Sequence, residues 1–279
     1  MFDWDGPEIR TILDRALAED IGTGDITSDA LFTKPTQISA AFVAKENGVI
    51  AGLPLVSRIF KRLNESCKTA FPVKDGQEVT APCVLCTVRG PANTLLAGER
   101  LALNFLQRLS GIATQAAFYA SLAVPFGIKV LDTRKTTPLL RLLEKYAVRM
   151  GGGRNHRFGL YDGVLVKDNH LKLQPDFRMI LESFGRKGIA PEKIEVEVTS
   201  LEMLKSAMDA GFSWFLLDNM KPSLIRRCVK IKRGNMTYEV SGGINQRNFP
   251  SYLIRGIDGI SIGALTHSVK SLDISMEME

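Results

Sequence analysis

The sequence predicts an α/β protein in which an N-terminal α+β domain precedes an incomplete α/β barrel. Three observations support this fold class. Hairpin signals crowd the first part of the chain, one long helical stretch follows them, and short apolar strands then alternate with amphipathic helices from residue 127 onward. A chain of 279 residues is long enough for one large or two modest domains.

The N-terminal domain combines helices with an antiparallel sheet. A helix is predicted over 9–20, and Asp25 or Thr27 in the polar turn after it can cap a second, short helix. Asn47-Gly48 and Asp75-Gly76 each stand between apolar runs, which is typical of β-hairpins. A helix around 95–122 then connects to the barrel. We therefore place the N-terminal domain at 1–115 and the barrel domain at 116–267.

Six segments of the second domain are apolar until their last residues, as strands buried on both faces of a parallel sheet are. They cover 128–135, 163–170, 193–200, 214–219, 238–243 and 259–264. Helical patterns lie between them, which indicates repeated βα units. Eight units would complete a standard barrel, so the sequence predicts an incomplete or atypical one, with an open doubly wound sheet as the alternative.

Ligands of parallel α/β folds collect at the carboxyl ends of the strands, so the chemistry is expected there. The polar and small residues at these ends are Asp132, Arg134, Lys135, Lys167, Asp168, Glu195, Glu197, Asp218, Ser241, Gly242, Gly243 and Gly263. Basic residues follow the first two strands, acidic residues end the central strands, and the last two strands end in small residues.

Two of these strand ends suggest a metal, and two suggest a phosphate. A lone carboxylate in such a place is more often a helix cap or a surface ion pair. Glu197 and Asp218, however, end neighbouring strands and would face the same space, as ligands of Mg²⁺ do. The glycines of SGGI and SIGA allow a phosphate to approach backbone N–H groups closely.

The segment MGGGRNHR, residues 150–157, places three glycines before a cluster of basic side chains. Like charges repel, so a purely structural loop gains nothing from concentrating them. We therefore predict that this loop binds an anion. His156 shares the cluster and is the strongest histidine candidate, whereas His170 and His267 are interpreted as structural.

Composition narrows the classes of partner. The formal net charge of +6 is moderate and is spread along the chain, which favours acidic small molecules over nucleic acid. No apolar run approaches about 18 residues, and the start MFDWDGPEIR lacks the build of a signal peptide, so we expect a cytoplasmic protein without a membrane span. Cys83-x-x-Cys86 lacks a second pair and is interpreted as packing rather than as a zinc site.

Several runs of the sequence closely resemble the quinolinate phosphoribosyltransferase family, the carboxylating nicotinate-nucleotide pyrophosphorylases of NAD synthesis. The most specific are LDTRKTTPLL, MGGGRNHR and KDNH in this order, with GERLALNFLQRLSGIAT before them and IEVEV, LLDNM, EVSGGI and ISIGALTHS after them. The resemblance covers nearly the whole chain. It implies a sandwich-like N-terminal domain, a barrel of about seven strands, and a C-terminal segment, 268–279, that packs back toward the first domain.

The resemblance also implies the site. Quinolinate, a pyridine with two adjacent carboxylates, would lie in a basic pocket, and phosphoribosyl pyrophosphate would bind with Mg²⁺ beside it. The pocket residues would be Arg134, Lys135, His156, Arg157 and Lys167, with Arg100 entering from a neighbouring subunit of a homodimer or a hexamer of dimers. Glu197 and Asp218 would hold the metal and act in catalysis with Lys135 and Lys167, and Ser241, Gly242, Gly243 and Gly263 would bind the 5-phosphate. Arg154 stands where the family often has an uncharged residue.

Three rival functions remain open at this stage. A related phosphoribosyltransferase could act on another aromatic acid, although such an enzyme should lose the paired basic cluster. A Schiff-base barrel lyase would use Lys167 as its nucleophile. A nucleic-acid binder would show steep salt dependence and make no product.

Overall fold

A computed structural model of the chain describes residues 2–32 and 36–278, which form two compact units. The first unit takes its described residues from Met1–Ala117, Thr136–Gly152 and Ser268–Glu279. The second consists of Phe118–Lys135 and Gly153–His267. The segment 136–152 thus packs with the first unit, although its place in the sequence suggests the barrel domain. The C-terminal segment also lies with the first unit.

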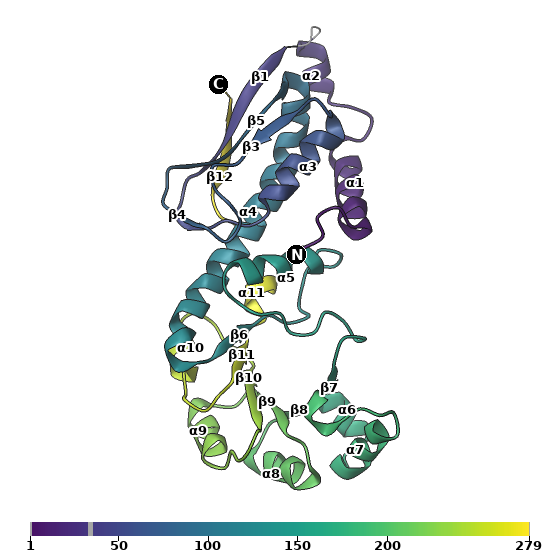
Figure 1. Cartoon of the computed structure of the whole chain (residues 1–279), viewed down its shortest axis with the longest axis vertical. Helices are drawn as coiled ribbons and strands as arrows, with labels where there is room; N and C mark the ends of the chain where they lie inside the picture. Colours follow the sequence, from purple (N-terminus) through teal and green to yellow (C-terminus); the bar gives the residue numbers. More distant parts are fainter. Residues whose placement is uncertain (1, 33–35, 279) are drawn as a thin grey trace. The chain divides into compact units, whose positions relative to one another are not determined.

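The first unit contains an antiparallel sheet in the order β12-β1-β5-β3. Its strands are β1 (Gln37–Ala44), β3 (Lys68–Ala70), β5 (Cys83–Pro91) and β12 (Ile274–Met278). Strand β12 comes from the far end of the chain and pairs with β1, as Figure 1 shows by their contrasting colours. Cys86 is buried in β5 and Cys83 is half-buried, and both are free thiols.

Neither predicted hairpin forms, although the sheet is antiparallel as expected. Asn47 lies between β1 and β2 (Gly48–Val49), but β2 pairs with β4 (Glu78–Val79) in a sheet of its own. Asp75-Gly76 likewise separates β3 from β4, which belong to different sheets. The Asp75 carboxylate instead accepts hydrogen bonds from the backbone N–H groups of Gly52 and Leu53, at 2.9 and 3.0 Å. Turn residues bend the chain locally, but long-range packing selects the partner of each strand.

Five helices accompany this sheet: α1 (Pro7–Ile21), α2 (Ile26–Leu31), α3 (Leu53–Leu63), α4 (Ala92–Ala123) and α5 (Arg141–Met150). Asp25 caps α2 by accepting hydrogen bonds from the backbone N–H groups of Thr27 and Ser28. Of the two predicted capping residues, Asp25 and Thr27, the cap is therefore Asp25. Helix α3 buries Val56, Ile59 and Phe60 completely, which follows from its amphipathic pattern.

Helix α4 is long and apolar. Together with the 3-10 turn η1 (Val124–Phe126) it is, within the part of the chain that the structure describes, one helix that could cross a membrane by length and composition alone. The mean hydropathy of its most apolar window is 1.2, and 44% of that window is buried inside the protein. Its polar side chains also contact the first unit: Ser110 Oγ accepts from Ala51 N–H at 3.1 Å, and Thr114 Oγ1 from Val49 N–H at 2.9 Å. These contacts are those of a core helix.

The second unit is built on a parallel sheet in the order β6-β11-β10-β9-β8-β7. Its strands are β6 (Lys129–Leu131), β7 (Val164–Val166), β8 (Ile194–Val198), β9 (Trp214–Asp218), β10 (Thr237–Ser241) and β11 (Gly259–Ser261). All six predicted strands are present, and each falls within or close to its predicted range. An isolated parallel bridge between Leu131 and Arg154 continues the sheet beyond β6. The barrel is therefore incomplete in the described residues, with six strands and one bridge where the resemblance implies about seven.

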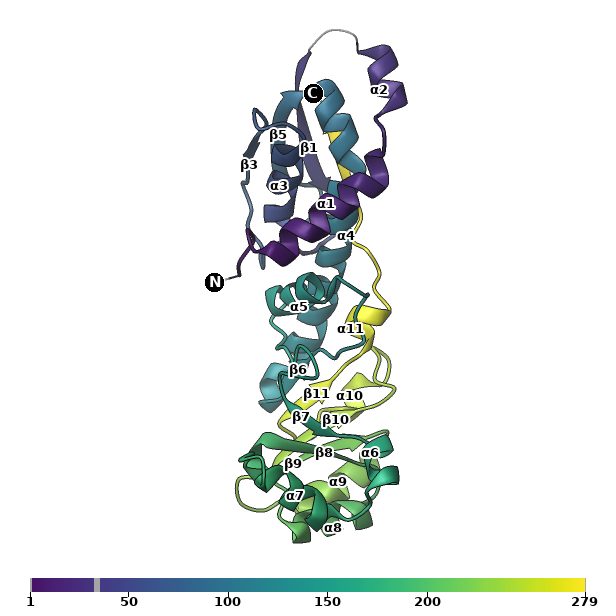
Figure 2. The same cartoon turned by 90° about the vertical axis from the view of Figure 1, so that its right-hand side faces the viewer.

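Helices α7 (Phe177–Gly185), α8 (Leu201–Ala210) and α9 (Pro222–Lys230) lie along the outer side of this sheet (Figures 1 and 2). Three further short helices are α6 (Asp168–Leu173), α10 (Phe249–Tyr252) and α11 (Ala264–His267), and Pro191–Lys193 forms a 3-10 turn, η2. Residues 168–170 and 264 were expected within strands but begin α6 and α11, so the strands end earlier than their apolar patterns suggest. This brings the polar residues into loops and helix starts, where they can meet a ligand.

Candidate active site

Strand β8 carries two carboxylates on one face. In its sequence IEVEV, Glu195 and Glu197 alternate with valines, and successive side chains of a strand point to opposite sides. Glu195 is 0% exposed and Glu197 is 7% exposed. Burying two carboxylates this way is costly unless neighbouring groups balance them. Their surroundings therefore define the chemistry of the site.

Asp218 and Lys167 lie close enough to Glu197 for their charges to act on it. Burial raises the pKa of Glu197, the negative charge of Asp218 raises it further, and the positive charge of Lys167 opposes both. Asp218 ends β9 and accepts hydrogen bonds from Ser241 Oγ at 2.5 Å and Asn219 Nδ2 at 2.6 Å. A divalent cation would balance the charge of Asp218 that acts on Glu197, and oxygen donors are those that Mg²⁺ prefers.

The turn after β10 has a shape that only glycine allows. Gly242 has a φ of +97° and Gly243 a φ of +60°, both in the left-handed region. A Cβ at Gly242 would lie 2.2 Å from Oδ1 of Asn219, which itself has a φ of +52°. Nothing lies within 4 Å of a Cβ placed at Gly243. The backbone of this turn at Gly243 is thus open to close approach.

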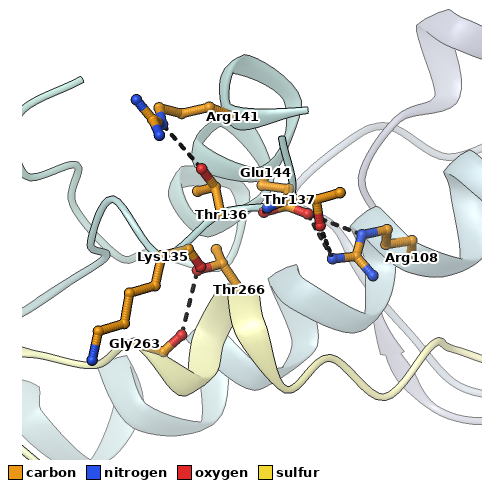
Figure 3. A network of polar contacts seen from close by, with 8 residues as sticks. All are labelled: Arg108, Lys135, Thr136, Thr137, Arg141, Glu144, Gly263 and Thr266. Carbon is orange, nitrogen blue, oxygen red and sulfur yellow. Dashed lines mark hydrogen bonds and ion pairs between the residues drawn. The ribbon is translucent and has the colours of Figure 1, made fainter. Parts of the chain in front are cut away.

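Lys135 and Gly263 are neighbours, although 128 positions separate them in the sequence. A Cβ at Gly263 would lie 3.1 Å from Cδ of Lys135, so the lysine side chain passes directly over the glycine. Thr266, which is 1% exposed, donates from Oγ1 to the carbonyl of Lys135 at 2.7 Å (Figure 3). The loop after β6 is thereby fastened to α11. Sequence reasoning missed Thr266, because nothing local marks a threonine that bonds a distant carbonyl.

Arg134 and Arg157 form a centre of positive charge. Burial lowers the pKa of the half-buried Arg157, and the charge of Arg134 lowers it further. One guanidinium nitrogen of Arg157, Nη1, donates to the carbonyl of Gly163 at 3.1 Å, which fixes its direction. Two guanidinium groups held close enough to repel each other are suited to binding a carboxylate-rich anion.

Two glycines of MGGGRNHR are required by the packing and the conformation of the backbone. Gly151 packs so tightly against α4 that a Cβ would lie 2.1 Å from the carbonyl oxygen of Ala113, and Gly152 has a φ of +81°. Arg154 then bonds the edge of β6 through its backbone: its N–H donates to Val130 O at 2.8 Å and its carbonyl accepts from Asp132 N–H at 3.1 Å. Its side chain is exposed. Arg154 therefore has a backbone role in the sheet.

His156 lies next to two buried glutamates, Glu195 and Glu239. Its Nε2 is 2.9 Å from Oε2 of Glu195 and 3.7 Å from Oε1 of Glu239, and its backbone N–H donates to the buried Asp132 at 3.0 Å. Sequence reasoning missed Glu239. Its signal was available in YEVSGG, where a glutamate stands within an otherwise apolar strand, as in IEVEV.

Two further residues considered in the sequence analysis are Arg100 and His170. Arg100 is exposed on α4 in the first unit. His170 Nδ1 accepts from the backbone N–H of Lys167 at 2.9 Å, a structural role as expected.

The first unit also contains a network that the sequence does not reveal. The Arg108 guanidinium donates to Oε1 of Glu144, at 2.6 Å from Nη2, and to Oγ1 of Thr137 at 2.7 Å (Figure 3).

Known proteins resemble this chain over nearly its whole length. Residues 25–110 match the N-terminal domain, and 112–277 the C-terminal domain, of quinolinate phosphoribosyl transferase. A probable nicotinate-nucleotide pyrophosphorylase [carboxylating] of Bacillus subtilis is 42% identical over 97% of this chain and 93% of its own length. The chloroplastic nicotinate-nucleotide pyrophosphorylase [carboxylating] of Arabidopsis thaliana is 37% identical over 98% of this chain and 83% of its own length.

Solved structures agree. NadC from Streptococcus pyogenes superimposes with a TM-score of 0.92 at 39% identity, over 98% of this chain and 96% of that one. The nicotinate-nucleotide pyrophosphorylase from Francisella tularensis gives a TM-score of 0.90 at 34% identity with the same coverage, 98% and 96%.

Proposed function

Because this chain belongs to the quinolinate phosphoribosyltransferase family, we propose that it transfers phosphoribose from phosphoribosyl pyrophosphate to quinolinate. The products are nicotinate mononucleotide, carbon dioxide and diphosphate, in the de novo synthesis of NAD. The observation that carries the proposal is the presence of two charge centres in the second unit. The charge of Arg134 acts on Arg157, which suits a dianion, and the charge of Asp218 acts on Glu197, which suits a metal-bound diphosphate.

The basic centre accounts for the choice of acceptor. Quinolinate presents two adjacent carboxylates, and guanidinium groups bind carboxylates in bidentate fashion. We assign quinolinate to Arg134, Lys135, His156, Arg157 and Lys167, with Arg100 supplied by a second subunit. The exposed Lys135 and Lys167 leave their ammonium groups available to the diphosphate as well, since both follow strands whose ends face the ligand.

Glu197 and Asp218 would hold a magnesium ion, which would supply positive charge to the leaving diphosphate. The 5-phosphate is assigned to the backbone of Ser241-Gly242-Gly243 and to Gly263, where glycine leaves room for it. With the ribose anchored at both ends, its C1 can be held next to the pyridine nitrogen of quinolinate.

The reaction then needs no covalent nucleophile from the protein. The bond between C1 and the diphosphate oxygen breaks, and the pyridine nitrogen forms a new bond to C1. The pyridinium so formed accepts the electron pair that carbon dioxide leaves at the adjacent carbon, which then takes up a proton. The protein contributes position and electrostatic stabilisation, by Lys135 and Lys167 above all.

Incubation of the protein with quinolinate, phosphoribosyl pyrophosphate and Mg²⁺ tests this function. Stoichiometric nicotinate mononucleotide and carbon dioxide are expected. Nicotinate, with one carboxylate fewer, should be a poor substrate because part of the basic centre would be left unpaired. Equal catalytic efficiency with nicotinate or with another aromatic acid would identify the enzyme as a relative of different specificity.

Two other functions make distinct predictions in the same experiment. A Schiff-base lyase would be trapped on Lys167 by borohydride with a carbonyl substrate, but Lys167 is exposed, whereas such lysines are usually desolvated. A nucleic-acid binder would form no product and would lose affinity steeply with salt.

We further propose a homodimer, alone or as the unit of a hexamer, in which Arg100 completes the site of the partner subunit. Cytoplasmic location also remains a proposal, because the names of plant relatives include chloroplastic and mitochondrial forms.

A further inference from the structure

A buried polar cluster in the second unit includes two residues that the proposed reaction does not use, Glu195 and Glu239. These two carboxylates and the ring of His156 place their possible ligand atoms all within 4.8 Å of one another. The side chains of Glu195, Glu239 and His156 are 0%, 4% and 12% exposed. Ser261 donates a hydrogen bond from Oγ to Oε1 of Glu239. With so little water, internal contacts decide where the protons lie.

Both ring nitrogens of His156 have partners within the protein. The backbone N–H of Arg157 donates to Nδ1 at 2.8 Å, so this nitrogen carries no proton. Nε2 lies 2.9 Å from Oε2 of Glu195, and a carboxylate there requires Nε2 to be the donor. These two contacts define the neutral Nε2–H form of the imidazole.

The backbone around His156 is also fixed. Asp132, which is 0% exposed, accepts from the backbone N–H of His156 at 3.0 Å and from Nδ2 of Asn155 at 2.5 Å. The segment that carries Arg157 is therefore held from β6 through Asp132 and from β8 through Glu195. His156 is the link between the second of these supports and the backbone of Arg157.

We propose that His156 acts as a neutral positioning residue that ties the buried Glu195–Glu239 pair to Arg157, while quinolinate is bound by the arginines and lysines. This inference rests on the proposed function for its ligand. It assigns roles to Glu195 and Glu239, and it changes the role of His156 from a cation of the pocket to a support for the pocket.

The charges of the surrounding groups support this assignment. Burial, and then the charge of Glu195, raise the pKa of Glu239 to about 8, whereas a positive charge on His156 would lower it. The charge of Glu195 also acts on Arg157, where it opposes the lowering of the arginine pKa by burial and by Arg134. The indole ring of Trp214 on β9, 6.4 Å from the imidazole between ring centres, adds no charge. A neutral His156 leaves the negative charge of Glu195 free to balance the two arginines.

The same three side chains could instead hold a divalent transition metal, since Oε1 of Glu195 is buried without a hydrogen-bond partner. A metal on Nε2 would replace the hydrogen bond to Glu195. This alternative makes the opposite prediction for the proton on that nitrogen, so one experiment separates the two.

The first test observes the imidazole directly by ¹⁵N NMR of the unliganded full-length protein at pH 7. The chain has three histidines, so comparison with His156→Asn assigns the signal. We expect a protonated Nε2 and an unprotonated Nδ1. A doubly protonated ring, or one metal ion per chain by elemental analysis, would overturn the proposal.

The second test measures quinolinate binding by calorimetry from pH 6 to 7.5. His156→Asn keeps an acceptor near the Nδ1 position, so its Kd should rise less than about tenfold, against about 100-fold or more for Arg157→Ala. The ratio of the His156→Asn and wild-type Kd values should not change with pH. If His156 were a cationic ligand, the affinity of the wild type for quinolinate would fall as pH rises through this range, whereas the affinity of His156→Asn would stay constant.

Glu239 supplies a matched pair of variants. Glu239→Gln keeps the size and the hydrogen-bonding groups of a protonated carboxyl, so its Kd should stay within about threefold of wild type. Glu239→Ala should weaken quinolinate binding several-fold more, and equal Kd values for the two variants would count against a positioning role. If the wild-type protein binds no quinolinate at all, the proposed function fails, and the NMR test still decides whether His156 is the neutral link.

Discussion

Glu197 and Asp218 lie toward the ends of two neighbouring strands, β8 and β9. Burial and the charge of Asp218 together raise the pKa of Glu197, and the serine and asparagine that bond Asp218 are neutral. Lys167 is the positive group that opposes this shift. At the scale of single residues, the acidic pair is therefore the part of the site in greatest need of an added cation.

Glu197→Ala combined with Asp218→Ala should abolish turnover and leave the Kd for quinolinate within about threefold of wild type, because the proposed metal would bind with the other substrate. Product assays and calorimetry on the same preparation measure the two effects. Glu192→Ala combined with Asp209→Ala removes two exposed carboxylates from the same unit and should leave both unchanged. Full activity of the Glu197 and Asp218 double variant would refute the magnesium assignment.

At the scale of elements, the loop after β6 and helix α11 are joined by one hydroxyl group. Thr266 Oγ1 donates to the Lys135 carbonyl at 2.7 Å and also lies 3.4 Å from the Gly263 carbonyl (Figure 3). Lys135 and Gly263 are assigned to different parts of the two substrates. The contact therefore sets the spacing between two subsites.

Thr266→Val keeps the shape of the side chain but leaves the Lys135 carbonyl without its donor, at a cost of about 1–3 kcal/mol. We expect kcat/KM to fall at least about tenfold because the loop moves to find another donor. Thr266→Ser keeps the hydroxyl group and should retain most of the activity. Steady-state kinetics of both variants is the measurement, and equal activities would show that the hydrogen bond is dispensable.

Helices α4 and α5 are joined in the first unit by an ion pair that is buried on one side. Glu144 is 0% exposed, whereas the Arg108 side chain is 30% exposed. The backbone N–H of Thr137 also donates to Glu144, at 3.1 Å (Figure 3). Glu144 thus has several donors, and Arg108 is the cation among them.

Arg108→Ala should lower the free energy of unfolding by about 3–5 kcal/mol, since it leaves a buried carboxylate without its cation. Urea denaturation measures this loss. Arg62→Ala is the matched control, because it breaks an ion pair with Asp14, whose side chain is 65% exposed, and should cost below about 1 kcal/mol. Similar losses for the two variants would contradict the importance of burial.

At the scale of the whole molecule, the proposal that Arg100 completes a neighbouring site requires a second subunit. Arg100 is exposed on α4, as an ordinary helix arginine would be. Its assignment to the partner's pocket comes from the family, and it makes oligomerisation a condition of activity.

Co-expression of Arg100→Ala with Arg134→Ala tests this arrangement. If Arg100 acts in trans, a mixed dimer has one doubly damaged site and one intact site, so random mixing should restore about a quarter of wild-type activity. If Arg100 acts in cis, every site carries a lesion. Mixed dimers verified by differently tagged subunits, and as inactive as either parent, would exclude the shared site.

The sequence by itself determined the parallel sheet and the residues that stand at its edge. Strands buried on both faces must be apolar along their length, so patterns such as IEVEV and WFLLD identify them without knowledge of their partners. The polar residues that end such strands then have to share one edge. For that reason the amino-acid sequence is enough to group Glu197, Asp218 and Lys167.

Only the tertiary structure decided which distant groups meet. Asn47-Gly48 and Asp75-Gly76 have the residues of hairpin turns, yet the strands beside each turn pair elsewhere. The contacts from Thr266 to Lys135 and from His156 to Glu195 join residues 131 and 39 positions apart. Local sequence fixes the preferences of the backbone over a few residues, whereas the partner of a buried polar group is whichever group the packing of the whole unit brings within hydrogen-bond distance.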